Sequence, residues 1–325
     1  TFRCGGMSDG CGGICEQACP AAPELDETLD RLRACSTSFP QTTHVFAVRS
    51  VTPGPLDMQE FAHRGCFIAD NPVDGIAPTA EPEKTAFRLE FEASNPEAVL
   101  GRSSPFINVS IEQVDGLGVP DAALVRVQCG EGAPWEPVRT WFDTSYALSP
   151  VSPEGELAIL QITGEEAAKA VHPVLYVDSL IDSLWYHVPD DVCGDGVDPA
   201  DVRVDIDGDG VPDDRQDPRW VAAQQTLLDR VRSEYGVGIV GHVTDAGAAC
   251  KFAPHLNGAD TELGGYTADP LGSRPDTDRA PVSHLRAWHT GTARCAGGAP
   301  CYRGVFTTAS PELDAHLHGQ PLPWE

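Results

Sequence analysis

Four aspartates in a short acidic segment are the residues whose types and spacing most clearly indicate a chemistry. Asp205, Asp207, Asp209 and Asp213 occupy positions 1, 3, 5 and 9 of the segment Asp205–Asp214, and glycine stands at position 6. Carboxylates this close repel one another unless a positive charge offsets them. A hard divalent cation with oxygen ligands is the natural partner, and calcium fits this spacing best. The sequence therefore predicts a calcium site in this segment.

The segment resembles the D-x-D-x-D-G loops of EF-hands, dockerins and thrombospondin type 3 repeats. The resemblance is local, so it identifies a site and no whole-chain family. It implies that the first three aspartates bind calcium through carboxylate oxygens and that Val211 binds through its main-chain carbonyl. It also implies that Asp213 makes a direct or water-mediated contact.

The segment departs from an EF-hand at position 12, where Gln216 stands in place of a bidentate glutamate. Asp214 or Asp217 would take that role. The alternative is a solvated acidic linker with no bound metal. If calcium binds, we expect it to order the junction between two domains and to take no part in catalysis.

A second candidate metal site involves the histidines near the C-terminal end. His316 and His318 would face the same way in a strand, because side chains two residues apart lie on one face. Together with one of His242, His284 and His289 they would suit copper or zinc. The alternative is that these histidines are polar surface positions.

The eleven cysteines indicate disulfides in an oxidising compartment, because none of their spacings is typical of zinc or haem. The first residue is Thr1, which suits a mature product after cleavage of a leader. We therefore expect a secreted or cell-surface protein. Cys66 and Cys129 are a candidate bridge, and Cys295 and Cys301 are expected to close a small disulfide turn. An odd count leaves one thiol over.

Charge and hydropathy exclude two classes of partner. The net charge of −27 would repel nucleic acid and anionic lipid. The sequence contains no apolar run long enough to span a membrane.

Two apparent motifs fail on their context. The segment Gly236–Gly241 matches G-x-G-x-x-G, but it follows a helical pattern and opens a strand, whereas a dinucleotide fold has the strand first and the helix after it. Trp141–Ser145 resembles an aspartic-protease loop but lacks its glycine, and the only loose partner is Val177–Ser179.

The sequence predicts that the elements positioning these residues are mainly β-strands. Residues 1–40 form a cysteine-rich segment with a short helix over Pro23–Cys35. Residues 41–189 are predicted to form an antiparallel β-sandwich, since strand-length patterns alternate with Pro and Gly. Its predicted strands are Thr43–Val51, Ala86–Ala93, Phe106–Gln113, Ala122–Cys129, Glu156–Thr163 and Val171–Asp178.

Residues 190–217 are predicted to be an acidic calcium-binding linker, and residues 218–325 a helix plus a smaller C-terminal β-rich domain. The helix is expected over Pro218–Tyr235, with Asp217 as its N-cap. Strands are expected over Val237–Thr244, Ser283–Thr290 and Tyr302–Thr308.

Together these features favour a calcium-stabilised extracellular binding or assembly protein, acting in adhesion or as a matrix or filament subunit. Its partner would be a protein or glycan surface, including a second copy of the chain. The competing hypothesis is a secreted copper- or zinc-binding protein or metal-dependent enzyme that uses the C-terminal histidines. The sequence favours the first, because it contains no recognisable catalytic constellation.

Overall fold

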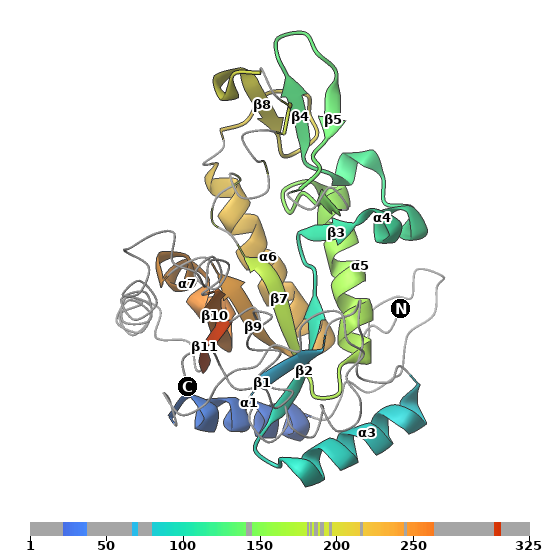
Figure 1. Ribbon diagram of the computed structural model, residues 1–325, viewed down its shortest axis with the longest axis vertical. Coiled ribbons are helices and arrows are strands. Elements are labelled where there is room, and N and C mark those ends of the chain that lie inside the picture. Colours follow the sequence, from blue (N-terminus) through green and yellow to red (C-terminus); the bar gives the residue numbers. More distant parts are fainter. Residues whose placement is uncertain are drawn as a thin grey trace, which may run out of the picture.

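The computed structural model describes residues 22–37, 67–70, 80–140, 145–180, 182, 184, 188, 192–194, 197–214, 217–243, 246–262 and 302–306. Its central feature is a six-stranded parallel sheet in the order β1-β2-β7-β9-β10-β11 (Figure 1). The strands are β1 (Phe67–Asp70), β2 (Val99–Ser104), β7 (Val174–Leu180), β9 (Gly238–Val243), β10 (Gly258–Glu262) and β11 (Tyr302–Phe306). This order follows the chain, as it does in α/β barrels.

Helices lie in the connections between the parallel strands from β1 to β10, as parallel pairing requires, and the connection from β10 to β11 lies outside the described residues. The helices are α1 (Ala22–Thr37), α3 (Glu81–Ser94), α4 (Ile111–Leu117), α5 (Pro153–Lys169), α6 (Pro218–Tyr235) and α7 (Ala246–Phe252), with 3₁₀ turns at Asp121–Ala123, Pro199–Asp201 and Ala253–His255. Because crossover connections are almost always right-handed, strands in chain order carry their connecting helices on one face. That face is called the outer face below.

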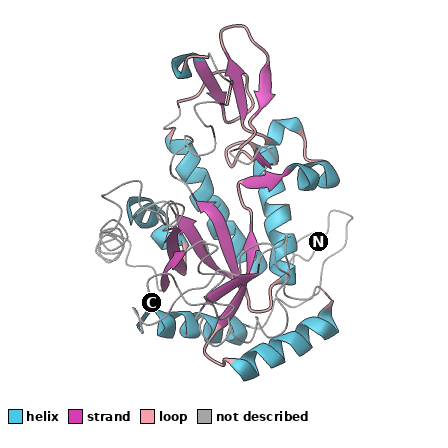
Figure 2. Ribbon diagram, viewed as in Figure 1, coloured by secondary structure: helices cyan, strands magenta, loops and turns pink. Residues whose placement is uncertain are grey.

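The prediction of a mainly β protein built on an antiparallel sandwich is wrong. The chain is an α/β protein whose main sheet is parallel, and helices make up much of its described part (Figure 2). The predicted strand Ala86–Ala93 lies within α3, and Glu156–Thr163 lies within α5. Strands that were expected in two separate domains, such as β7 and β9, pair directly with each other.

Local sequence explains where the longest helices begin and end. In α6, the Asp217 side chain accepts a hydrogen bond from the Arg219 N–H, Pro218 occupies the first turn, and Gly236 closes the helix in the left-handed conformation at φ 64°. These bounds match the predicted helix. In α5, the Ser152 side chain caps the Gly155 N–H ahead of Pro153.

Each face of the main sheet carries its own hydrophobic cluster. The outer face carries Leu175 and Ile239, which pack with α5 and α6 residues such as Ile159 and Leu228. The inner face carries a smaller cluster, to which Leu32 of α1 also belongs: Phe67, Ala69, Val99, Val174, Tyr176 and Val240. Helix α1 contacts both β2 and β11, near opposite edges of the sheet, so the sheet curves around it.

A small antiparallel sheet lies at one end of the molecule, and α1 and α3 lie at the other (Figure 1). Its order is β5 (Trp135–Pro137), β4 (Arg126–Cys129) and β8 (Val202–Asp205). Strand β4 comes from the connection after β2, and β8 from the connection after β7. We call these three strands and residues 206–214 the loop module. A further pair, β3 (Asn108–Ser110) and β6 (Ser145–Ala147), belongs to the same connection as β4.

A disulfide between Cys129 and Cys193 links the two connections that build the loop module. The predicted bridge from Cys66 to Cys129 is therefore wrong. Cys250 in α7 is also disulfide-bonded. The predicted strands Thr43–Val51 and Ser283–Thr290 and the turn at Cys295–Cys301 lie outside the described residues. Within the described part of the chain, no helix is both long and apolar enough to cross a membrane.

Candidate functional site

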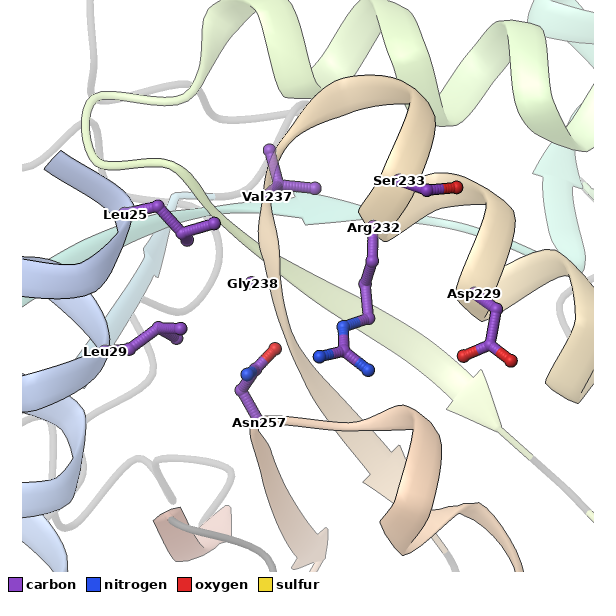
Figure 3. Close-up of a pocket in the computed structure, with 8 residues that line it drawn as sticks. All are labelled: Leu25, Leu29, Asp229, Arg232, Ser233, Val237, Gly238 and Asn257. Atoms are coloured by element: carbon purple, nitrogen blue, oxygen red, sulfur yellow. The ribbon is translucent and has the colours of Figure 1, made fainter. Parts of the chain in front are cut away.

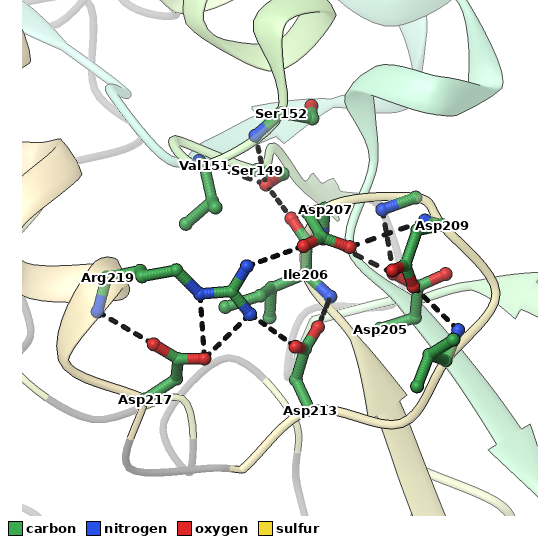
Figure 4. Close-up of polar contacts among 12 residues, drawn as sticks. Ser149, Val151, Ser152, Asp205, Ile206, Asp207, Asp209, Asp213, Asp217 and Arg219 are labelled. Carbon is green, nitrogen blue, oxygen red and sulfur yellow. Dashed lines mark hydrogen bonds and ion pairs between the residues drawn. The ribbon is translucent and has the colours of Figure 1, made fainter.

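The acidic segment forms a tight loop between β8 and α6 (Figure 4). Asp205 is fully buried, and its carboxylate accepts hydrogen bonds from the N–H groups of Gly208 (2.7 Å) and Gly210 (3.0 Å). Asp207 and Asp209 each accept the N–H of the residue two positions later, which is the Asx-turn pattern. Gly208 and Gly210 have φ angles of 77° and 79°, a conformation that glycine adopts without strain.

The loop brings together three of the predicted calcium ligands. Carboxylate oxygens of Asp205, Asp207 and Asp209 all lie within 4.8 Å of one another. Asp213 belongs to the same loop, and its Oδ2 accepts the Ile206 N–H at 2.8 Å. Val211 and Asp214 lie on the exposed side, and Val211 is 58% exposed. The predicted transition-metal residues His284, His289, His316 and His318 lie outside the described residues.

An arginine from α6 offsets much of the negative charge of this loop. The Arg219 guanidinium contacts Asp207 at 2.6 Å, Asp217 at 2.7 Å and also Asp213 (Figure 4). The pKa values of Asp213 and Asp217 shift in opposite directions. Burial, together with the nearby Asp207 charge, raises the pKa of Asp213 despite its contact with Arg219. The hydrogen bond from Arg219 lowers the pKa of Asp217, and these carboxylates in turn raise the pKa of Arg219.

The loop is also tied to the start of α5. The Ser149 hydroxyl donates to the Ile206 carbonyl and accepts the N–H groups of Val151 and Ser152, both at 3.1 Å. Because Ser152 caps α5, one short segment positions both the helix and the loop. The acidic loop thus links the three strands of the loop module to α5 and α6.

A second group of polar residues lies where the parallel strands end. In α/β barrels the connections at the C-terminal ends of the strands carry the active site. The inner face carries Tyr176 on β7 with His242 of β9 beside its ring, and Asp178 follows Tyr176 two residues later on β7. Tyr176 is buried, and its ring centroid lies 6.2 Å from that of His242. We call these three residues, with Ser103, the sheet-edge site.

The register of the strands supports this grouping. Ser103 is the β2 partner of Tyr176, and His242 is the β9 partner of Asp260 on β10. Strands β2, β7 and β9 therefore bring Ser103, Tyr176 and His242 to the same edge.

Asp178 lies in an irregular part of β7. The β7–β9 register shifts between Val177 and Leu180, which indicates a β-bulge. Leu180 packs in the outer cluster, although regular alternation from Tyr176 would place it on the inner face. Asp178 is exposed, whereas Val177 beside it is fully buried. Bulges are over-represented next to active sites because they redirect a side chain.

The sheet-edge site was not among the sequence-based predictions of function. The signal was present: an unbroken apolar run, Val174–Val177, ends in Asp178, and Gly238–Val243 contains His242 near its end. Continuous apolar runs are typical of parallel strands that are buried on both faces. A single run does not identify its neighbours, so the convergence of these residues needs the sheet order.

Comparisons with known proteins give only distant likenesses. No protein-family model and no curated protein sequence matches the chain. Among solved structures, it is similar to a cycloisomaltooligosaccharide glucanotransferase of a Paenibacillus species, at 9% identity and a TM-score of 0.47 over 86% of this chain and 39% of that one. It is similar to a xylosidase of Aspergillus niger, at 8% identity and 0.45 over 86% and 48%. It is also similar to a trehalose-6-phosphate hydrolase of Bacillus licheniformis, at 10% identity and 0.46 over 80% and 56%.

The chain therefore spans between 39% and 56% of the length of these three proteins. At this level of similarity, the function has to be argued from the residues of the chain itself.

Proposed function

We propose that the chain is a hydrolase of neutral, hydroxyl-rich substrates such as glycosides, with its active centre at the sheet-edge site. The observation that carries this proposal is the exposed Asp178 carboxylate at the C-terminal end of a central parallel strand, next to the Tyr176–His242 pair. Its position at that edge and in a bulge supports a role in ligand contact.

The chemistry of the group favours acid–base catalysis. Glycoside hydrolysis uses two carboxyl groups that flank the scissile bond, and it needs neither a serine nor a cysteine nucleophile. Asp178 is the first candidate. Position 260 lies two strands away, which puts the two backbones about 10 Å apart at the usual strand spacing. The backbone position of residue 260 suits the second carboxyl group that this chemistry needs.

The charge of the protein supports the choice of substrate. A net charge of −27 would repel anionic substrates such as phosphate esters and uronic acids. A neutral glycoside pays no such penalty, and its hydroxyl groups can donate to Asp178 and exchange hydrogen bonds with His242 and Ser103.

The test is hydrolysis of a panel of neutral aryl glycosides and neutral polysaccharides by the full chain and by Asp178→Asn. We expect the substitution to lower kcat by about 10²- to 10⁴-fold, since it removes an acid–base group but keeps the shape. Asp201→Asn, an exposed aspartate of the Pro199–Asp201 turn, is the matched control and should retain activity. If Asp178→Asn hydrolyses these substrates as fast as the Asp201→Asn control does, the proposal is contradicted.

A second candidate function rests on the acidic loop. We propose that calcium binds Asp205, Asp207 and Asp209 and stabilises the loop module of an extracellular protein that binds a protein or glycan surface. The observation in favour is the approach of the three carboxylates. Arg219 now contacts Asp207, so it would compete with the ion. Copper or zinc binding by the C-terminal histidines stays a prediction.

Calcium titration by calorimetry tests this second candidate. Asp209→Asn should weaken binding, while Arg219→Gln should strengthen it, because the loop then lacks its internal cation. Asp121→Asn, an exposed aspartate outside the loop, is the control. If the chain takes up no calcium at millimolar concentration, with or without Arg219, the loop is an acidic turn neutralised by arginine alone.

A further inference from the structure

A pocket of about 310 Å³ lies at the end of the sheet opposite to the sheet-edge site (Figure 3). It lies where β9 begins, since Gly238 is the first residue of that strand, and Asn257 directly precedes β10. Helix α1 and the last turns of α6 form its walls. Its lining residues are Leu25, Leu29, Asp229, Arg232, Ser233, Val237, Gly238 and Asn257. Its volume falls at the lower end of those that hold small ligands.

Two opposite charges enter this pocket from the same helix face. Asp229 and Arg232 are three residues apart on α6, and both side chains project toward the pocket (Figure 3). Residues at this spacing commonly pair with each other. Asp229 instead contacts the His255 ring at 2.9 Å, and no ion pair of Arg232 is found among the described residues. Within the described part of the chain this guanidinium therefore has no carboxylate partner, although the net charge of the sequence is −27.

A fixed amide and an apolar wall complete the pocket. The Asn257 Oδ1 accepts the Ile239 N–H at 2.9 Å, which holds the side chain in place and leaves its NH₂ group as a donor. Leu25, Leu29 and Val237 supply apolar surface on the other side. A Cβ at Gly238 would lie 2.9 Å from the Leu29 side chain, so this wall depends on the glycine.

We propose that the pocket binds a free α-amino acid with an aliphatic side chain. The carboxylate of the ligand would pair with the planar fork of Arg232 and accept from the Asn257 amide. Its ammonium group would meet the Asp229 carboxylate, and its side chain would pack against Leu25 and Leu29. A ligand with one charge would satisfy only half of this arrangement. The site is separate from the sheet-edge site and does not depend on the function proposed for it.

The test uses L-leucine and two analogues of similar size, measured by calorimetry on the full chain. 4-Methylpentanoate lacks the ammonium group, and 3-methylbutylamine lacks the carboxylate. We expect leucine to bind and each analogue to bind about tenfold more weakly or worse, because each loses a charge-assisted contact.

Variants locate the binding. Arg232→Gln should abolish leucine binding. Arg232→Lys, which keeps the charge but not the fork, should retain a weaker affinity and shows that the pocket is still folded. Arg203→Gln on β8, in the distant loop module, makes the same charge change and should bind as the unmodified chain does. The proposal is overturned if leucine does not bind at millimolar concentration, if the analogues bind equally well, or if Arg232→Gln leaves the affinity unchanged.

Discussion

Replacing Gly155 by alanine should destabilise the fold more than any other single-methyl change at a described helical glycine. Gly155 lies in the first turn of α5, and an added Cβ would be 1.9 Å from the Ser149 carbonyl oxygen and 2.9 Å from that of Ala123. Ordinary contact begins near 3.4 Å, so the helix or the Ser149 backbone must move by about 1.5 Å.

The magnitude follows from two opposing effects. Overpacking a buried site costs about 1–3 kcal/mol, and the upper end applies because the clashing atoms are backbone and cannot rotate away. Alanine regains up to about 1 kcal/mol of helix propensity. We therefore expect Gly155→Ala to lower the free energy of unfolding by about 2 kcal/mol or more.

Gly116→Ala is the matched control for this prediction. Gly116 lies within α4, and a Cβ there would meet nothing within 4 Å. The same methyl group should raise stability by up to about 1 kcal/mol. Urea unfolding of both variants in one buffer should give midpoint shifts of opposite sign. If Gly155→Ala is as stable as the unmodified chain, the close approach of α5 to Ser149 is not a feature of the folded protein.

Three further predictions concern buried groups and the cross-link. Burial lowers the pKa of His172, so as the pH falls the histidine takes up a proton in the unfolded chain before it does so in the folded one. The free energy of unfolding should therefore fall by up to about 1.4 kcal/mol per pH unit below about pH 6.5. Urea unfolding of His172→Gln should show a weaker dependence of stability on pH. Glu166→Gln should cost about 3–5 kcal/mol in the same assay, because Glu166 and Arg102 are only 3% and 5% exposed and the substitution removes the negative charge from their 2.7 Å ion pair. Replacing Cys129 and Cys193 by serine should lower stability by about 4 kcal/mol, given the sequence separation of 64; a variant that unfolds at the same urea concentration would refute a stabilising role.

The helix α6 was predictable from sequence because its signals are local. Asp217 and Pro218 mark its start, Gly236 marks its end, and Trp220, Leu227 and Val231 form one buried stripe. A surface helix with one apolar face shows the helical period clearly.

Helices α5 and α3 were mistaken for strands for two different reasons. Leu157, on the exposed side of α5, continues the apolar run of the buried residues Ala158, Ile159 and Leu160, so this run resembles a buried strand. In α3, the alternation around Phe87 and Phe91 suggested a period of two. The same two rings are stacked four residues apart on one helix face, with centroids 6.5 Å apart.

The two candidate sites also differ in how far local sequence determines them. The acidic loop was predictable because its aspartates are two residues apart in the chain and its turn depends on local hydrogen bonds. The sheet-edge site joins β7 to β9, and α6 lies between them in sequence. Strand pairing of this kind depends on the packing of the whole sheet, which a single sequence segment does not encode.

The pairing of β4 with β8 has a consequence for the order of folding. The two strands are separated in the chain by β5, β6, α5 and β7, so their ladder closes a loop of more than seventy residues. Closing so long a loop becomes favourable only when the intervening α5 and β7 are already docked on the main sheet. We therefore expect the Cys129–Cys193 disulfide to form late during oxidative refolding, after the parallel sheet has acquired its native packing.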